Sequence, residues 1–164
     1  RSRRVGLIAT AASVRSGAYQ RSLRQLDPDI AVTAKACPLF VPLVENGRFR
    51  RGDVVIETVA REYLEPLRRE GLDTLILGCT HYPLLTDIIG DIMGPGVTLI
   101  NTGEEAAWEL KRTLRAMDLL APEGPAGRAT LCASDQPEHF GVMAAYFLGE
   151  SLTRPVQPVD IDRY

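Results

Sequence analysis

The chain has 164 residues, a formal net charge of −2 and 24% charged side chains. This length suits one ordinary domain or parts of two, and the charge gives no electrostatic basis for binding nucleic acid. No apolar stretch approaches the ~18 residues that a membrane-spanning helix needs, and the N-terminus has no signal-peptide pattern. We therefore expect a soluble protein with no membrane association and no secretion.

Apolar runs alternate with helical patterns along the chain. In chain order we predict a strand at 5–10, a helix at 16–26, a strand at 30–34, a loop at 37–47, a helix from 53 toward 71, a strand at 74–77, a helix at 84–93, a strand at 97–100, a helix at 104–119, a strand at 129–133 and a helix at 139–148. Ser16 is the cap candidate of the first helix, and Pro66 should kink the second helix or end its regular part. Residues 121–127, rich in proline and glycine, predict a linker or long turn. Strands separated by helices predict an α/β fold with a parallel sheet and flanking helices.

Small polar side chains follow the predicted strands at their C-terminal ends. They are Thr10, Cys79, Thr102 and Ser134. Ligands of open α/β sheets bind at this edge, so these residues could line a site for a small polar ligand. Serine and threonine also cap helices at such positions, and this is the favoured interpretation for Thr102 and Ser134.

The strongest chemical signal is the segment Gly78-Cys79-Thr80-His81-Tyr82-Pro83, which follows the predicted strand at 74–77. Proline is tolerated in the first turn of a helix, so Cys79 and His81 lie on a strand-to-helix loop. An imidazole can take up the proton of a thiol, which would make Cys79 a nucleophile or a general base. A small buried side chain is the structural alternative for a cysteine alone, and it is favoured for Cys37 and Cys132.

Several other chemistries find little support in the sequence. The three cysteines are an odd number without close pairs, which argues against disulfides and favours the cytoplasm. Cys79 and His81 have no partners at zinc-site spacing, so no metal is expected. Neither lysine has a Schiff-base context, and no glycine-rich phosphate loop is present, so the chemistry should need no cofactor. Glu45, taken alone, is a surface carboxylate.

Taken together, four segments in order resemble a bacterial glutamate racemase of the aspartate/glutamate racemase family. They are Gly6-Leu7-Ile8-Ala9-Thr10 with Val14, Ser16 and Tyr19; Cys37-Pro38-Leu39-Phe40-Val41-Pro42-Leu43-Val44-Glu45; Leu75-Ile76-Leu77-Gly78-Cys79-Thr80-His81-Tyr82-Pro83-Leu84-Leu85; and Pro137-Glu138-x-Phe140 with Phe147-Leu148-Gly149. The resemblance spans nearly the whole chain.

This resemblance implies interconversion of L- and D-glutamate for peptidoglycan synthesis, cell wall biogenesis and cell shape, without a cofactor. Two cysteines on opposite faces of the substrate exchange the α-proton, and Cys79 matches the one that acts on the L-enantiomer. His81 would tune Cys79 or relay its proton, and Glu45 matches a carboxylate near that histidine. Thr10, Ser13 and Thr80 match positions that bind the substrate, although the family has threonine where Ser13 stands.

The resemblance also implies an architecture of two α/β domains with the active site between them. Residues 1–100 would form most of the second domain, and residues 101–164 would complete the first. The family's N-terminal half, which carries the first catalytic cysteine, has no counterpart in the sequence, and Cys37 matches a different position. A homodimer would be in keeping with the family.

Three alternative functions remain at this point. The chain could be a catalytically incomplete fragment or a binding module that keeps half of a site. It could instead be a related aspartate racemase or another two-cysteine isomerase. A cysteine hydrolase would need an oxyanion hole, to which nothing in the sequence points.

Overall fold

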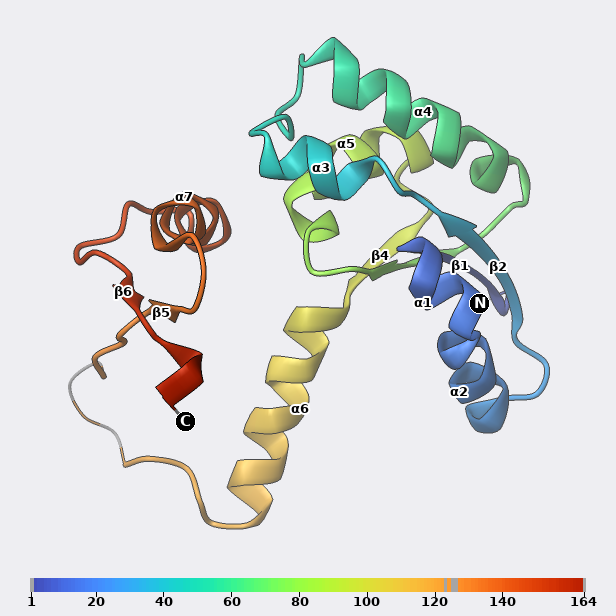
Figure 1. Cartoon of the computed structure of the whole chain (residues 1–164). Coiled ribbons are helices and arrows are strands. Elements are labelled where there is room, and N and C mark those ends of the chain that lie inside the picture. The colour runs from blue at the N-terminus through green and yellow to red at the C-terminus, as the bar shows by residue number, and fades with distance from the viewer. Residues whose placement is uncertain (1, 123, 125–126, 164) are drawn as a thin grey trace. The chain divides into compact units, whose positions relative to one another are not determined.

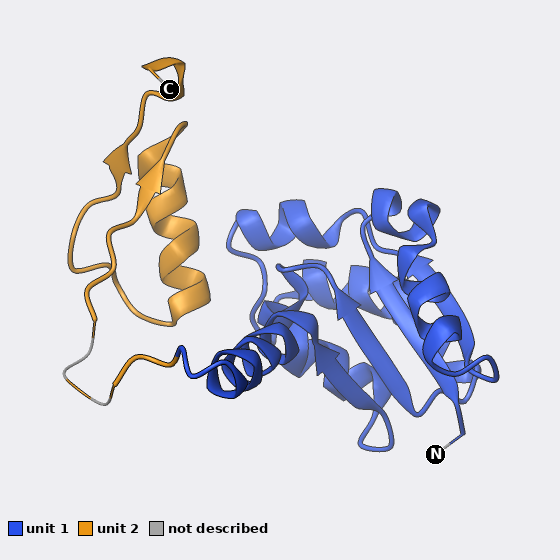
Figure 2. Cartoon of the chain, turned by 90° about the horizontal axis from the view of Figure 1, so that it is seen from below, with its two compact units in different colours: residues 1–119 blue, residues 120–164 orange. Residues whose placement is uncertain are grey.

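The structure is a computed structural model, and it describes residues 2–122, 124 and 127–163. The chain forms two compact units, residues 1–119 and 120–164 (Figure 2). The sequence predicted a boundary near residue 100 for the domains of a whole racemase. That boundary stays a prediction.

A four-stranded parallel sheet forms the centre of unit 1, in the order β2-β1-β3-β4. Its strands are β1 (Arg4–Ala9), β2 (Ala31–Ala36), β3 (Thr74–Gly78) and β4 (Thr98–Asn101). The predicted α/β class with a parallel sheet is confirmed. Ala9 pairs with Gly78 at the C-terminal edge, so the loops after β1 and β3 begin side by side.

Helices cover both faces of this sheet (Figure 1). They are α1 (Ala11–Ser16) and α2 (Ala18–Leu26) on one face, and α3 (Phe40–Glu45), α4 (Val54–Arg69) and α5 (Thr86–Met93) on the other. Side chains alternate between the faces of a strand, so Leu7 packs with the α1 and α2 side. Ile8, Leu75 and Leu77 are also fully buried, and the sheet is therefore the core of unit 1.

The helices of the first half differ from the prediction in three places. The predicted helix at 16–26 is α2, which starts at Ala18, and the Ser16 hydroxyl accepts a hydrogen bond from the Ala18 amide at 3.3 Å. Ser16 itself is the last residue of α1, a separate helix that Thr10 caps by accepting from the Ser13 amide. The predicted loop at 37–47 contains α3, whose proline stands in the first turn, where it is tolerated. Pro66 does not end α4, which continues to Arg69, and the kink that was the alternative stays a prediction.

Two later helical segments of unit 1 also differ from the prediction in how they begin. The segment after Cys79 starts with the 3₁₀ turn η1 (Tyr82–Leu85) before α5. Helix α6 (Thr102–Ala116) starts two residues early, with Asn101 as its cap: the Asn101 Oδ1 accepts from the amides of Gly103 and Glu104. Thr102 therefore does not cap the helix, and its hydroxyl donates to the Leu77 carbonyl at 3.0 Å.

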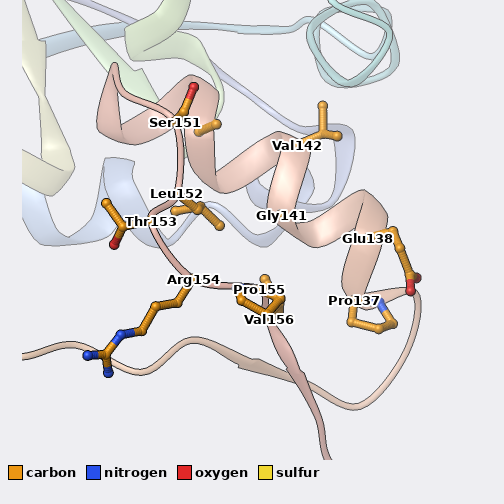
Figure 3. Close-up of a pocket in the computed structure, with 11 residues that line it drawn as sticks. Pro137, Glu138, Gly141, Val142, Ser151, Leu152, Thr153, Arg154, Pro155 and Val156 are labelled. Carbon is orange, nitrogen blue, oxygen red and sulfur yellow. The ribbon is translucent and has the colours of Figure 1, made fainter.

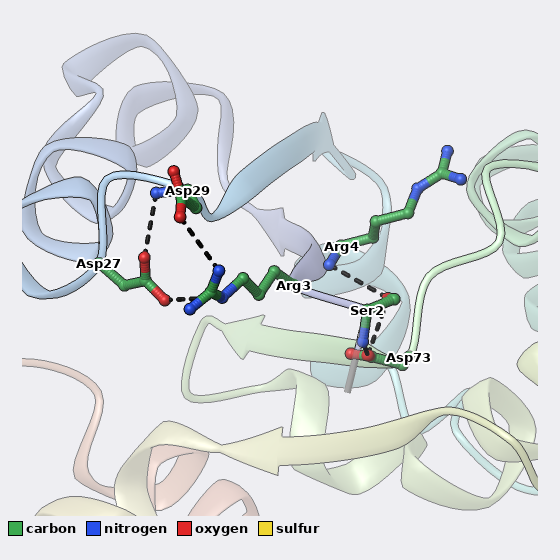
Figure 4. Close-up of polar contacts among 6 residues, drawn as sticks. All are labelled: Ser2, Arg3, Arg4, Asp27, Asp29 and Asp73. Carbon is green, nitrogen blue, oxygen red and sulfur yellow. Dashed lines mark hydrogen bonds and ion pairs between the residues drawn. The ribbon is translucent and has the colours of Figure 1, made fainter.

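Polar contacts fix the N-terminal end of β1 (Figure 4). The Ser2 hydroxyl donates to Asp73 at 2.8 Å, and hydrogen bonds from Ser2 hold the pKa of the Asp73 carboxyl below its usual range. The Arg3 guanidinium lies 3.0 Å from both Asp27 and Asp29. The charge of Arg3 is thus compensated within the fold.

Unit 2 is smaller and built around α7 (Pro137–Leu148). Its two-stranded parallel sheet joins β5 (Cys132–Ala133) and β6 (Gln157–Pro158), and η2 (Ile161–Arg163) follows. The predicted strand at 129–133 is only two residues long, and β6 and η2 were not predicted. The prediction of a packed Cys132 is wrong, because its side chain is exposed on this short strand.

Part of the predicted linker at 121–127 falls on residues 123, 125 and 126, which lie outside the described residues. Among the helices that the structure describes, none is long and apolar enough to cross a membrane.

Candidate functional site

The loop after β3 is held in place by Tyr82. The Tyr82 amide donates to the Cys79 carbonyl at 3.1 Å, and its phenol donates to the Cys37 carbonyl at 3.0 Å. The ring is fully buried and packs edge-on against Phe40, with centroids 5.2 Å apart. Tyr82 thus fixes Cys79 and His81 at the sheet edge. No role was predicted for this tyrosine, although it stands directly after His81.

The side chains of Cys79, His81 and Glu45 form a row that is linked by polar contacts. The sequence predicted the pairing of Cys79 with His81, and the resemblance added Glu45. The Cys79 Sγ lies 4.0 Å from His81 Nδ1, and His81 Nε2 lies 3.2 Å from Glu45 Oε1. A carboxylate oxygen accepts hydrogen bonds, so Nε2 carries the donated hydrogen. In the neutral ring Nδ1 is then the acceptor that faces Cys79. This tautomer can take a proton from the thiol.

Thr80 adds a hydroxyl to the same row. Its Oγ1 lies 3.3 Å from His81 Nδ1, the ring nitrogen that also faces the Cys79 thiol. Thr80 is exposed, whereas Cys79 and His81 are half-buried. The row is therefore open to solvent on the Thr80 side.

Glu45 comes from a different element, the last residue of α3. This helix is anchored from within by the buried side chains of Phe40 and Val44. Its end is capped by Asn46, whose side-chain amide donates to the Pro42 carbonyl at 2.7 Å. The Glu45 side chain is 41% exposed, so its pairing with His81 adds little to stability.

Thr10 and Ser13 lie on the neighbouring loop. Thr10 directly follows β1, and Ala9 pairs with Gly78, so Thr10 and Cys79 leave the sheet at the same edge. The hydroxyls of Thr10 and Ser13 are hydrogen-bonded to each other at 3.0 Å. Ser134 follows β5 in unit 2. It therefore belongs to a different sheet from Thr10, Cys79 and Thr102, the other polar residues predicted at strand ends.

Cys37 is a buried thiol, as the sequence predicted. Its side chain is 0% exposed, and burial raises the pKa of this thiol to about 12. A thiol of this kind stays protonated near neutral pH and cannot act as a base. Cys79 is therefore the thiol of unit 1 that chemistry can use.

Unit 2 holds a pocket of about 500 Å³ between α7 and residues 151–156 (Figure 3). Its lining is largely apolar, and its charged members are Glu138 and Arg154. It contains neither a thiol nor an imidazole. Among the described residues, no group of three or more His, Cys, Asp and Glu could hold a metal ion. The row of Cys79, His81 and Glu45 is thus the stronger candidate for chemistry.

Comparison with known proteins identifies the family of this chain. The family model Asp/Glu/Hydantoin racemase matches residues 1–110. Glutamate racemase of Geobacter metallireducens is 43% identical over 93% of this chain and 56% of its own length. The crystal structure of glutamate racemase from Thermus thermophilus in complex with β-chloro-D-alanine is 45% identical, with a TM-score of 0.82 over 98% of this chain and 58% of that one.

A third relative was solved with an amino acid. Glutamate racemase from Francisella tularensis, in complex with D-glutamate, has a TM-score of 0.85 at 31% identity and matches 99% of this chain. The match covers 60% of that protein. The chain thus spans a little under two thirds of each of these relatives.

Proposed function

The chain belongs to the Asp/Glu/hydantoin racemase family, and on that basis we propose that it carries one proton-transfer half of a cofactor-independent glutamate racemase. The observation that carries the proposal is the row of Cys79, His81 and Glu45 at the C-terminal edge of the sheet. The relatives named as glutamate racemases, at 43% and 45% identity, favour glutamate over aspartate.

In the proposed reaction Cys79 works on one face of the substrate. His81 Nδ1 accepts the thiol proton, while Glu45 holds the ring through Nε2. The thiolate then removes the α-proton of L-glutamate, and the electron pair of the C–H bond stays on the α-carbon. In the reverse direction the thiol returns a proton to that face. The hydroxyls of Thr10, Ser13 and Thr80 would donate to the substrate carboxylates or accept from its amine.

Inversion requires a second base on the opposite face of the α-carbon. Cys37 is buried with its pKa raised, so it does not qualify. We assign the second thiol to the part of the family fold that lies outside the match to this chain. In this arrangement residues 1–100 form the domain that carries Cys79, and residues 101–164 complete the other domain.

The biological setting belongs to the same proposal. D-Glutamate would be supplied for peptidoglycan, which maintains the cell wall and cell shape, in the cytoplasm. L- and D-glutamate are the proposed substrates, and a homodimer would be in keeping with the family.

The test compares the 164-residue chain with a completed protein. The completed protein carries, ahead of this chain, the part of the Thermus thermophilus glutamate racemase that the chain does not match. A chiral assay follows L- and D-glutamate, with aspartate as the competing substrate. We expect interconversion of glutamate by the completed protein, and a loss of about 10²–10⁴-fold in Cys79→Ala, the usual contribution of one general base.

Cys132→Ala is the matched control, because this thiol is exposed and lies in unit 2. Its activity should equal that of the parent. Undiminished racemisation in Cys79→Ala would refute the role of this thiol. Faster turnover of aspartate than of glutamate would reassign the substrate.

A further inference from the structure

Two donors compete for one nitrogen of His81. Nδ1 lies 3.3 Å from the Thr80 hydroxyl and 4.0 Å from the Cys79 thiol. With Nε2 turned to Glu45, the neutral ring offers a single lone pair at Nδ1. The closer oxygen is within ordinary hydrogen-bond reach, whereas the sulfur is at the limit of a weak contact.

This geometry sets the resting state of the thiol. A hydroxyl is a stronger donor than a thiol, so Thr80 holds the lone pair that Cys79 needs for deprotonation.

We propose that the Thr80 hydroxyl occupies His81 Nδ1 in the ligand-free site and so restrains Cys79, and that a carboxylate ligand releases this restraint. The second half rests on the proposed function, which supplies the carboxylate. Thr80 is here a positioning residue for the thiol, a task separate from contact with the substrate.

A carboxylate ligand can release the nitrogen because the hydroxyl has one hydrogen to give. Hydrogen bonds to an ionised acceptor are about twice as strong as those between neutral groups. Thr80 is exposed at the open side of the row, so an arriving carboxylate can draw its hydrogen away from the ring. The lone pair of Nδ1 then becomes available to Cys79. The thiol would thus be activated when the substrate binds and would stay protonated and less reactive in its absence.

The first test measures thiol reactivity without any ligand. The chain is treated briefly with iodoacetamide, and labelling at each cysteine is read by peptide mass spectrometry. Exposed Cys132 is the internal reference, and buried Cys37 reports on folding because it should label only when the chain opens. Thr80→Val removes the hydroxyl with little change of shape, Thr80→Ala repeats the removal, and Thr80→Ser keeps the hydroxyl.

We expect the ratio of Cys79 to Cys132 labelling to rise about three- to tenfold in Thr80→Val, which corresponds to the loss of one competing hydrogen bond. Thr80→Ala should show the same rise in this ratio, and Thr80→Ser should have the ratio of the parent protein. A ratio that is unchanged or lower in both hydroxyl-free variants, with Cys37 still protected, would overturn the proposal. A role of Thr80 in packing alone would not distinguish serine from alanine in this way.

The second test observes the imidazole itself. The sequence has two histidines, His81 and His139, so ring ¹⁵N resonances can be assigned with one His81→Gln variant. Addition of D-glutamate should move the Nδ1 signal of His81 toward its position in ligand-free Thr80→Val, while His139 stays unchanged. Binding of glutamate without this movement would contradict the release step.

The two proposals can fail separately. If the completed protein does not racemise glutamate, the proposed substrate is wrong, and the labelling ratio still decides whether Thr80 restrains Cys79. If racemisation is found but the ratio is insensitive to the hydroxyl, the function stands and the restraint is refuted.

Discussion

Burial separates the thiols of this chain into different chemical roles. Cys37 and Cys79 both precede a turn at the C-terminal edge of the sheet, but Cys37 is fully buried and Cys79 is only partly so. The pKa of Cys37 is raised to about 12 by desolvation, an effect that the charge of Lys35 only partly offsets. Neighbouring Tyr82 is also held neutral, since burial raises the pKa of its phenol.

Alkaline pH should therefore destabilise the fold through Cys37. An unfolded thiol ionises near its ordinary value of 9.0, whereas the folded one resists ionisation until about 12. The stabilising effect is complete below the lower value and is lost as the pH rises above it, because unfolding then releases a proton. We expect the unfolding free energy to drop between about pH 8 and about pH 10, and the drop to be about 1 kcal/mol smaller in Cys37→Ala.

Urea titrations of both proteins at the two pH values give this difference. Other groups that ionise in this range are common to both proteins and cancel. Equal drops in the parent and in Cys37→Ala would contradict the assignment.

At the scale of elements, the close pairing of β1 and β3 requires glycine at position 78. A Cβ on Gly78 would lie 3.0 Å from the Ile8 carbonyl oxygen and 3.1 Å from the Ala9 Cβ. Both atoms belong to the central strand β1, which cannot move aside. In contrast, a Cβ on Gly90 in α5 meets nothing nearer than Leu99, at 3.9 Å.

Alanine should therefore have opposite effects at these two glycines. Gly78→Ala should lower the unfolding free energy by about 1–3 kcal/mol, the usual cost of overpacking. It should also lower activity, because Cys79 is the next residue. Gly90→Ala should raise the unfolding free energy by about 0.5–1 kcal/mol, since alanine favours the helix. Denaturant unfolding of the two variants measures these changes. Changes of the same sign in the unfolding free energies of both variants would refute the packing argument.

The elements also show which parts of the fold could be predicted from the sequence. Apolar runs bounded by turn residues located all four strands of unit 1 to within two residues, because buried parallel strands depend on local hydrophobicity. Helix α3 was missed because Pro42 in a short segment is typical of a loop. The connection of Glu45 to His81 joins residues 36 apart in sequence, and its distance required the fold. Cys132 looked packed from its apolar neighbours, yet a two-residue strand leaves it exposed.

At the scale of the whole molecule, α6 lacks the cover that α4 has, the other helix of similar length. None of its described residues is buried, whereas α4 buries five side chains. Trp108 and Leu110 on α6 are 52% and 58% exposed. The chain spans 56% of the Geobacter relative, so the proposed second part of the fold would have this apolar surface available.

Trp108 can report whether the proposed domain completion occurs, since it is the one tryptophan of the sequence. In the 164-residue chain its fluorescence should resemble that of a solvated indole and be quenched readily by iodide. In the completed protein we expect emission at shorter wavelength and weaker quenching, because α6, as part of residues 101–164, would then pack against the added part of the fold. Subtracting the spectrum of Trp108→Phe in each background removes the signal of any tryptophan that the added part contributes. Unchanged quenching in a completed protein that racemises glutamate would show that catalysis needs the second thiol but not a covered α6. It would therefore reject the assignment of residues 101–164 to the other domain, while the role of Cys79 would stand.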